Sequence, residues 1–478
     1  YPTGKLSTFL TLSYEKQNGL ASRDRWFSAT ADSRVFGATS ASFYLSQVAG
    51  GAGSLSSTSS PQNAGHANLP GLTTNIVGLP SGSNGTTAAN SAFTTTVPVQ
   101  FDPNQYSMAI DPATRRSATF KAEYDHASWA KFYVDGRISE FKNEFTGTPI
   151  TLSTSLPAGY PGNPFTSSVF LRKVFWDLPL PLTISKQQNK AISAGVRGDF
   201  LGTWRYDAGF SIARNVVIDD AVTASGFNFT VLNSLINNAD PALRPILAYD
   251  STRVSSSALF QSAFLVPDHK DTTDYLQYTV SADGSVWSGW AGDVKLALGA
   301  ELGEEKVKFY RDASIATPTF VLSKPFSRKS TASFAEVTIP LLSAKQKIPL
   351  VHRLEVGGAA RAQDYDDVGG VVTPTYRALF QPVKWITLRT SRSEGFKPVR
   401  LYDLLGPVTT GTTTLTTTSN VRDNLRGGEL VLGTFTRSFG GNPTLKPEES
   451  VSKNGGIVID VPGKWFKGLS FSADYYQF

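Results

Sequence analysis

The chain has 478 residues, of which 40% are hydrophobic, 12% aromatic and 18% charged, with a net charge of +6 and no cysteine. This composition is too apolar for an intrinsically disordered protein, and the lack of cysteine excludes a disulfide framework and a thiolate metal site. The lysines and arginines are scattered and form no basic run, so the charge does not indicate a nucleic-acid partner.

The hydropathy of the chain excludes a transmembrane helix, since its mean is −0.15 and no run of about 18 apolar residues occurs. A membrane-spanning β-barrel escapes this test, because lipid-facing and lumen-facing residues alternate and each strand averages to nearly neutral. The sequence begins at Tyr1 in strand-like alternation, without the charged and apolar segments of a signal peptide before it. We interpret the chain as incomplete.

The clearest strand pattern in the first third of the chain lies between residues 117 and 139. Phe120 and Tyr124 alternate with Lys121 and Glu123, and after a short turn the alternation resumes as far as Ile138. This pattern predicts an antiparallel hairpin with one charged face. The same alternation returns near residues 190, 204, 292, 351 and 385.

Along the whole chain, the pattern predicts about fourteen strands of roughly ten residues, a length that crosses a bilayer when the strands tilt. They lie near residues 5, 23, 117, 129, 190, 204, 274, 292, 331, 351, 372, 385, 450 and 467. Short turns and long loops alternate, with one exception at the brief loop 363–370. This alternation is typical of an all-β transmembrane antiparallel β-barrel with short periplasmic turns. We expect its long extracellular loops at 37–116, 142–189, 215–272 and 394–449.

One face of the predicted strands carries most of the charges, and in such a barrel this face lines the lumen. Ion pairing within the wall, without substrate contact, is the alternative explanation for each charge. The lumen-facing candidates are Lys121, Glu123, Arg137, Arg205, Asp207, Arg353, Glu355, Arg361 and Arg389. Aromatic residues near strand ends suit membrane interfaces, although aromatics favour strands in general. They are Trp129, Tyr133, Trp176, Trp204, Trp385, Trp465, Tyr475 and Tyr476.

Two short stretches near the C-terminal end break the alternation. "SEGFKPV" ends a predicted strand, and "GNPTLKPEE" leads into the next strand with two prolines that force extended backbone before them. They resemble the signature of TonB-dependent outer-membrane receptors, Ser-x-Gly-Phe-(Arg/Lys)-x-Pro, a long loop, and Gly-Asn-Pro-x-Leu-Lys-Pro-Glu. One departure is that the first proline, Pro398, directly follows the lysine. The matching residues are Ser393, Gly395, Phe396, Lys397, Gly441, Asn442, Pro443, Leu445, Lys446, Pro447 and Glu448.

The resemblance implies that residues 1–478 are a fragment of one barrel domain, holding about 14 strands of a total of about 22. It also implies an N-terminal plug and a short segment that contacts TonB. The expected partners are the TonB complex, a small-molecule or oligosaccharide substrate and outer-membrane lipid, with the protein a monomer in the bacterial outer membrane. Ferric siderophores, carbohydrates, cobalamin-like cofactors and peptides stay open as substrates. Loop aromatics that would stack on a substrate, or pack the loops on themselves, are Phe227, Phe229, Tyr249 and Tyr365.

Patterns typical of catalysis or metal binding do not occur in the sequence. The four histidines are isolated, and neither a Gly-x-Ser-x-Gly elbow nor a phosphate-binding loop is present. We therefore expect no enzyme activity, no bound metal and no cofactor. Two alternatives to an energised receptor stay open. A passive porin would lack the Asn-Pro-x-Leu-Lys-Pro-Glu corner, and a secreted β-rich glycan-binding or adhesion protein would be apolar on both faces of its strands.

Overall fold

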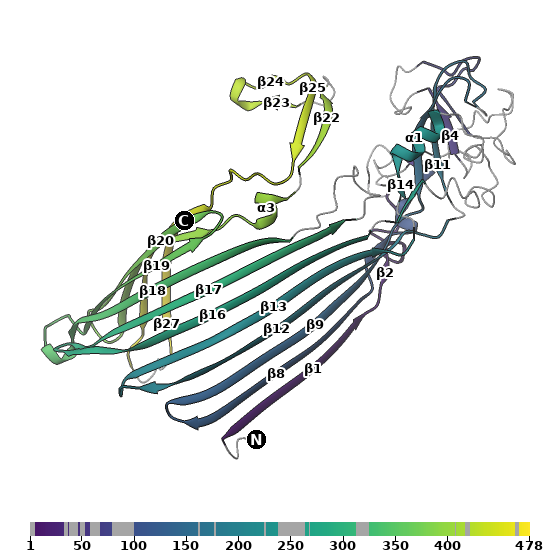
Figure 1. The fold of residues 1–478 in the computed structure, drawn as a ribbon. Helices are drawn as coiled ribbons and strands as arrows, with labels where there is room; N and C mark the ends of the chain where they lie inside the picture. The colour runs from purple at the N-terminus through teal and green to yellow at the C-terminus, as the bar shows by residue number, and fades with distance from the viewer. Residues whose placement is uncertain are drawn as a thin grey trace.

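One large antiparallel sheet dominates the computed structural model of the chain (Figure 1). No helix in the described part of the chain is long and apolar enough to cross a membrane. The structure describes residues 5–32, 37, 46–47, 53–57, 67–78, 100–160, 163–175, 178–223, 226–237, 263–266, 268–311, 325–406, 408–415, 421–463 and 468–478.

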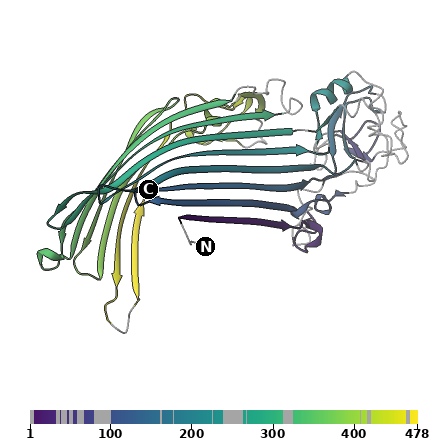
Figure 2. The same ribbon diagram turned by 60° about the horizontal axis from the view of Figure 1, so that its bottom comes forward.

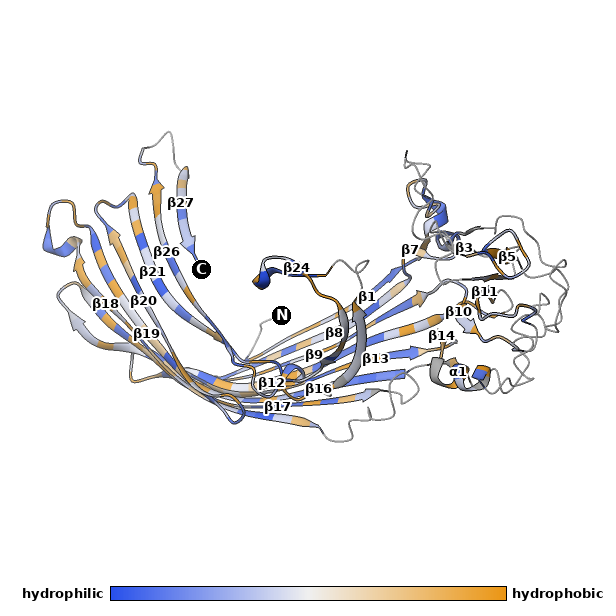
Figure 3. Ribbon diagram, turned by 90° about the horizontal axis from the view of Figure 1, so that it is seen from above, coloured by the Kyte–Doolittle hydropathy of each residue, from blue (hydrophilic) through white to orange (hydrophobic). Residues whose placement is uncertain are grey.

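The main sheet has thirteen strands, each hydrogen-bonded to the next, and it curves into a trough that is open between its first and last strands (Figures 2 and 3). The all-β antiparallel fold is thus confirmed. In order across the sheet, the strands are β1 (Leu6–Gln17), β8 (Ala113–Ala127), β9 (Ala130–Thr146), β12 (Leu182–Phe200), β13 (Trp204–Ala221), β16 (Asp268–Gly289), β17 (Gly292–Arg311), β18 (Phe326–Ser343), β19 (Arg353–Tyr365), β20 (Gly369–Gln381), β21 (Ile386–Lys397), β26 (Glu448–Asp460) and β27 (Ser470–Gln477).

The connections divide the sheet into two rims. Short connections join β8 to β9, β12 to β13, β16 to β17, β18 to β19, β20 to β21 and β26 to β27, and we call this end the short-turn rim. At the opposite end, the long-loop rim, only β19 and β20 are joined briefly, through residues 366–368. Several strands run further than the sequence pattern predicts, since β9 ends at Thr146 and β12 begins at Leu182, within the predicted loop range 142–189. The extracellular position of the four loop ranges stays a prediction.

The strand predicted near residue 23 is wrong. Ser22–Asp24 forms a 3₁₀ helix, η1, where three consecutive charged residues break the alternation that a strand requires. The backbone N–H of Ser22 donates to the carbonyl of Ser107 (2.9 Å), and Arg23 donates to the carbonyl of Gln105 (3.1 Å). Those contacts fix η1 beside a second 3₁₀ helix, η5 (Pro103–Gln105), at the long-loop rim.

The pairing register separates the main sheet into a polar face and an apolar face, because directly opposed residues of neighbouring strands point to the same side. On the polar face, ion pairs span two strands: Arg197 of β12 reaches Glu123 of β8, and Arg361 of β19 reaches Glu301 of β17. Side chains two strands apart approach each other in this way on the concave side of a curved sheet. The polar face is therefore the concave one, and the apolar face is convex.

The convex face exposes large apolar side chains over the half of the strands nearest the short-turn rim. Ile212, Tyr278 and Leu302 are 47%, 53% and 56% exposed, respectively. A soluble protein seldom leaves so continuous an apolar surface uncovered. Figure 3 shows polar and apolar residues alternating along the strands. The alternation places the apolar residues on the convex face and the polar residues on the concave face.

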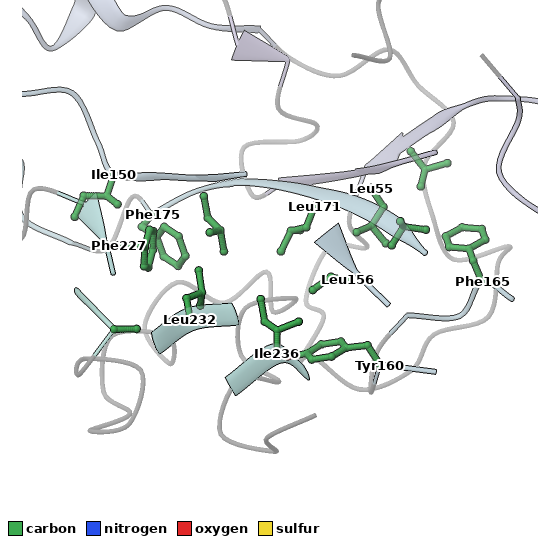
Figure 4. Packing of buried hydrophobic residues seen from close by; sticks show 14 of the residues in the cluster. Leu55, Ile150, Leu156, Tyr160, Phe165, Leu171, Phe175, Phe227, Leu232 and Ile236 are labelled. Carbon is green, nitrogen blue, oxygen red and sulfur yellow. The ribbon is translucent and has the colours of Figure 1, made fainter. Parts of the chain in front are cut away.

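Three of the long connections fold together into a cap at the long-loop rim. Its four-stranded sheet has the order β10 (Thr151–Leu156), β11 (Val169–Val174), β4 (Gly53–Ser56) and β5 (Ile76–Gly78). It packs with helix α1 (Phe229–Asn237) and the two-stranded sheet of β14 (Gly226–Phe227) and β15 (Phe264–Leu265). The cap has its own hydrophobic core, in which Leu55, Leu171 and Leu232 are fully buried (Figure 4). These segments join different pairs of strands, so the cap ties separate loops to one another.

A fourth connection, residues 398–447 between β21 and β26, forms what we call the arm. It begins with helix α3 (Leu401–Leu405) and continues into a ribbon of β22 (Thr409–Leu415) and β25 (Gly433–Phe439). A short hairpin of β23 (Arg422–Asp423) and β24 (Glu429–Leu430) forms its tip, which projects away from the sheet in Figure 1. The arm and the cap thus occupy the same rim.

Candidate functional site

All nine lumen-facing candidates lie on the concave face of the sheet. In the pairing register Lys121 opposes Asp135, Arg205 opposes Asp283 and Asp207 opposes Arg197, and the same face continues through every strand to β27. Their role as a lumen wall stays a prediction, but the geometry brings them onto one surface. The nine are Lys121, Glu123, Arg137, Arg205, Asp207, Arg353, Glu355, Arg361 and Arg389.

Most of these charges are neutralised within the sheet itself. Arg205 binds Asp283 at 2.7 Å, and Arg389 binds Asp474 with two hydrogen bonds of 3.0 and 2.6 Å. Arg361 binds both carboxylate oxygens of Glu301, and Arg353 pairs with Glu355 two residues further along its strand. The sequence predicted these arginines but not all of their carboxylate partners, because only the pairing register determines which residues meet across the sheet. The concave face is therefore hydrated and charged, yet largely self-paired.

The concave face contains two hollows near the short-turn rim. The larger, of about 930 Å³, is lined by residues of β17 to β21 that include Arg353, Glu355 and Arg389. The smaller, of about 490 Å³, is lined by residues of β8 to β16 that include Arg205 and Asp207. Five of the nine candidates thus face open space in which a polar chain or solute has room.

The two halves of the sequence signature meet at the base of the arm. Lys397, the last residue of β21, opposes Glu448, the first residue of β26, and their side chains form an ion pair at 3.2 Å. The side chain of Asn442 accepts hydrogen bonds from the N–H (3.0 Å) and hydroxyl (2.7 Å) of Thr444, which fixes the turn around Pro443. Gly441 approaches the arm backbone so closely that a Cβ would lie 2.5 Å from the nitrogen of Gly406. The signature therefore builds a rigid base for the arm.

A buried ion pair, which the sequence did not reveal, connects this base to the neighbouring strands. Arg328 of β18 is 5% exposed, and its guanidinium donates three hydrogen bonds to the carboxylate oxygens of Asp367 (2.8, 2.8 and 2.6 Å) and one to the carbonyl of Val399 (2.7 Å). The same guanidinium lies over the ring of Tyr365, which stacks on Phe396 of the signature at 5.9 Å. We call these five residues the latch. The brief connection 366–368, an exception on its rim, carries Asp367 to this contact.

Helix α3 packs against β17 and β18 next to the latch. Leu401 is 2% exposed and packs with Val307 of β17 and Phe326 of β18. Arg400, at the helix N-terminus, donates to Asp403 at 2.7 Å, and this hydrogen bond raises the pKa of the Arg400 guanidinium. Apolar packing and charge pairing together hold the first turn of the arm against the rim.

Of the four loop aromatics proposed to stack on a substrate, two are engaged in the protein's own packing. Phe227 is 4% exposed and stacks on Phe264 at 4.8 Å inside the cap core, so its ring is not offered to a ligand. Tyr365 is the last residue of β19 and belongs to the latch, so it does not lie in a loop. Phe229 is the first residue of α1, and its side chain lies outside the described part of the structure; Tyr249 lies outside the described residues altogether.

Aromatic residues mark the short-turn rim, as the sequence predicts for Trp129, Trp204 and Trp385. Trp287 and Trp290, which the sequence reading missed, join them at the β16–β17 turn and are 54% and 65% exposed. The prediction for Tyr133 is wrong, since its hydroxyl donates to Asp207 (2.7 Å) on the concave face. Tyr475 and Tyr476 lie near the end of β27, opposite Gly455 and Asn454 of β26. Trp176 and Trp465 lie outside the described residues.

Within the described part of the chain, no group of three or more His, Asp or Glu side chains is arranged to hold a metal ion. Glu304 and Glu305 point to opposite faces of β17, and Asp367 is bound to Arg328. His269 pairs with Asp219 at 2.6 Å on adjacent strands. Asp219 and Asp367 thus pair with side chains of the protein itself.

Comparison with known sequences places the chain in a family. The family described as "TonB dependent receptor-like, beta-barrel" matches residues 140–477, and the chain belongs to this family. No curated protein matches the chain.

Solved structures that resemble the chain include the siderophore receptor PirA from Acinetobacter baumannii, at 13% identity over 73% of this chain and 41% of that one, with a TM-score of 0.43. The ferric enterobactin receptor PfeA from Pseudomonas aeruginosa is 14% identical over 78% of this chain and 43% of that one, with a TM-score of 0.46. The ferric preacinetobactin receptor BauA from Acinetobacter baumannii is 10% identical over 73% and 45%, with a TM-score of 0.39. The chain spans less than half the length of each.

Proposed function

We propose that the complete protein is a receptor of the bacterial outer membrane that takes up a scarce substrate, with energy supplied through the TonB complex. The observation that carries the proposal is the two-faced sheet, with an apolar convex face that suits lipid and a charged concave face that suits a hydrated interior. Membership of the TonB-dependent receptor family supports the same conclusion. Because this is a family of receptors and transporters, we infer that the chain is not an enzyme.

The parts of the structure suggest a division of labour in this uptake. The cap and the arm share the long-loop rim, which would face the outside and meet the substrate first. The concave wall would then pass the substrate inward, and its self-paired charges would hold a permeating solute only weakly. We propose a small molecule as substrate, and a ferric siderophore first, because siderophores are the best-known cargo of the family.

The experiment that tests this function uses the complete protein in its native outer membrane. Uptake of radioactive iron bound to a panel of siderophores is measured in wild-type cells, in cells lacking this protein, and in both after the proton gradient is collapsed. The proposal requires one siderophore whose uptake needs both the protein and the gradient. Uptake that persists without the gradient would instead indicate a passive porin.

The secreted-protein alternative has its own discriminating result. An adhesion or glycan-binding protein would be released in soluble form, whereas a barrel would sediment with the outer membrane and need detergent for extraction. The exposed side chains of Ile192, Tyr278 and Leu302 on the convex face favour the membrane. Recovery of the protein in the soluble fraction would reject the proposed location together with the uptake mechanism.

A further inference from the structure

The convex face changes character abruptly along four neighbouring strands. Toward the short-turn rim, the residues of this face are uncharged from Ile192 to Phe200 on β12, from Trp204 to Ile212 on β13, from Leu276 to Gly284 on β16 and from Val294 to Leu302 on β17. Toward the long-loop rim, the next residue of the same face is charged on every one of these strands. These residues are Lys190, Arg214, Asp274 and Glu304. Such a border between apolar and charged residues is where an outward-facing strand leaves the hydrocarbon of a membrane.

The charged side of this border carries more cations than carboxylates. Six cations and four carboxylates occupy the convex face of β12, β13, β16 and β17, which leaves a net charge of +2. The cations are Lys186, Lys190, Arg214, Lys270, Lys306 and Lys308, and the carboxylates are Asp220, Asp268, Asp274 and Glu304.

Three of these cations have a carboxylate partner within the protein. Arg214 binds Asp274 through two hydrogen bonds, while Lys306 pairs with Glu304 at 3.0 Å. Lys186 lies 3.8 Å from Asp220. The remaining three, Lys190, Lys270 and Lys308, form no ion pair with any described carboxylate, and all three are exposed.

The unpaired lysines lie close to like charges. Lys190 stands directly opposite Arg214 in the β12–β13 register, an arrangement of like charges that Asp274, the partner of Arg214, offsets in part. Lys270 opposes Tyr310, and Lys308 is two residues from Tyr310 on β17, so these two lysines are diagonal neighbours on one face. An external anion that bridges such pairs would remove the repulsion and find several donors at once.

We propose that Lys190, Lys270 and Lys308 bind the phosphate groups of lipids in the outer leaflet of the membrane. Toward the short-turn rim on the same strands, Ile192 lies two residues from Lys190, Leu276 six residues from Lys270 and Leu302 six residues from Lys308. These apolar side chains would contact the acyl chains of the bound lipids. The chemistry of the surface therefore matches an amphiphile with a phosphorylated headgroup better than a free anion. This inference rests on the proposed membrane location of the strands, and it goes beyond the proposed uptake of a substrate.

A titration followed by native mass spectrometry tests the proposal on the complete protein in detergent. The probes are diphosphoryl lipid A, its monophosphoryl form, a phosphate-free glycolipid with similar acyl chains, and inorganic phosphate. We expect affinity to fall with each phosphate removed, and roughly tenfold or more from the diphosphoryl to the phosphate-free lipid, since each cation near an anionic surface contributes to binding. Equal affinity for all three lipids, or displacement of the lipid by millimolar inorganic phosphate, would overturn the proposal.

Substitution locates the binding surface. The triple variant Lys190→Gln, Lys270→Gln and Lys308→Gln should bind diphosphoryl lipid A roughly tenfold more weakly, whereas replacement of the same three lysines by arginine should retain binding. The control is Lys345→Gln, Lys347→Gln and Lys384→Gln, an equal charge change at exposed positions of the short-turn rim. An equal loss in the control would reject the assignment.

The failure of this inference can be told apart from a failure of the proposed function. Fractionation of cells that express the wild-type protein reports its membrane location independently of any lipid preference. A wild-type protein found in the outer membrane, whose lipid A affinity does not depend on phosphate number, sinks the inference alone. This wild-type comparison needs no variant, so it decides the question even if the triple variant does not fold.

Discussion

Replacement of Arg328 by alanine should release the base of the arm while leaving the barrel sheet intact. The substitution removes the three hydrogen bonds to Asp367, the bond to the carbonyl of Val399 and the contact with the Tyr365 ring. Loss of one partner from a buried ion pair costs about 3–5 kcal/mol, because the other charge is left without compensation. Since the side chain of Asp367 keeps 20% of its exposure, water reaches it in part, and we expect the lower end of that range, about 3 kcal/mol.

Hydrogen–deuterium exchange of the α3 amides measures this effect locally. The N–H groups of Leu404 and Gly406 donate to the carbonyls of Arg400 and Tyr402, at 3.1 and 2.8 Å. If the latch limits their opening, a loss of about 3 kcal/mol accelerates exchange by up to roughly a hundredfold. Peptides from β12 and β13 should exchange as in the wild type, because the latch does not contact them.

Two further variants separate the ion pair from a general loss of packing. Arg328→Met combined with Asp367→Asn removes both charges, and it should disturb α3 much less than Arg328→Ala does. Arg214→Ala is the matched control, since Arg214 makes a similar two-bond pair with Asp274 on the exposed convex face. The reasoning is refuted if Arg328→Ala leaves exchange at α3 unchanged, or if the double variant is as severe as the single one.

Three other substitutions test the packing described above. Gly195→Ala would place a Cβ 2.5 Å from the hydroxyl of Tyr133, so it should lower the stability of the folded barrel in urea by about 1–3 kcal/mol. Leu171→Ala, at a fully buried site of the cap, should destabilise the cap by about 2–5 kcal/mol, seen as faster amide exchange in β10 and β4. Lys397→Glu places two carboxylates next to each other at the base of the arm, and their repulsion should make proteolysis of the arm faster. The increase should be small, because Glu448 is exposed and solvent screens the charges.

Each of these substitutions has a control within the chain. Gly136→Ala, where the nearest neighbour of the new Cβ lies 4.0 Å away, should leave the urea transition of the barrel in place. Leu425→Ala, at a side chain that is 98% exposed, should leave amide exchange in the cap unchanged. Charge exchange in the double variant Lys397→Glu with Glu448→Lys should restore protease resistance, and a persistent loss would show that the ion pair is not the cause.

The strands and their two faces could be predicted from the sequence because a period of two residues is a local property. Lys121 and Glu123 alternate with Phe120 and Tyr124 in the sequence, and the register keeps each pair on its own face. The segment near residue 23 shows the limit of this method, since a few apolar residues around Arg23 imitated a strand.

The cap and the latch depend on contacts between segments far apart in the chain, and no local pattern announces them. Leu55, Leu171 and Leu232 share one core but come from three different connections, each with an unremarkable local sequence. Arg328 and Asp367 meet because β18 and β19 are paired in one register, which single-sequence reasoning does not fix. The signature at Lys397 and Glu448 was identifiable, whereas the ion pair that joins its two halves required the structure.

Because three connections contribute side chains to one cap core, these loops cannot be exchanged one at a time. A single loop exchanged with a relative would arrive without the partners that its apolar residues bury against, and the other two loops would lose theirs. Successful transplants would have to move all three segments together, and natural divergence in one segment would select compensating changes in the other two. Reagents raised against the cap should accordingly recognise a conformational surface and fail to bind peptides copied from any one loop.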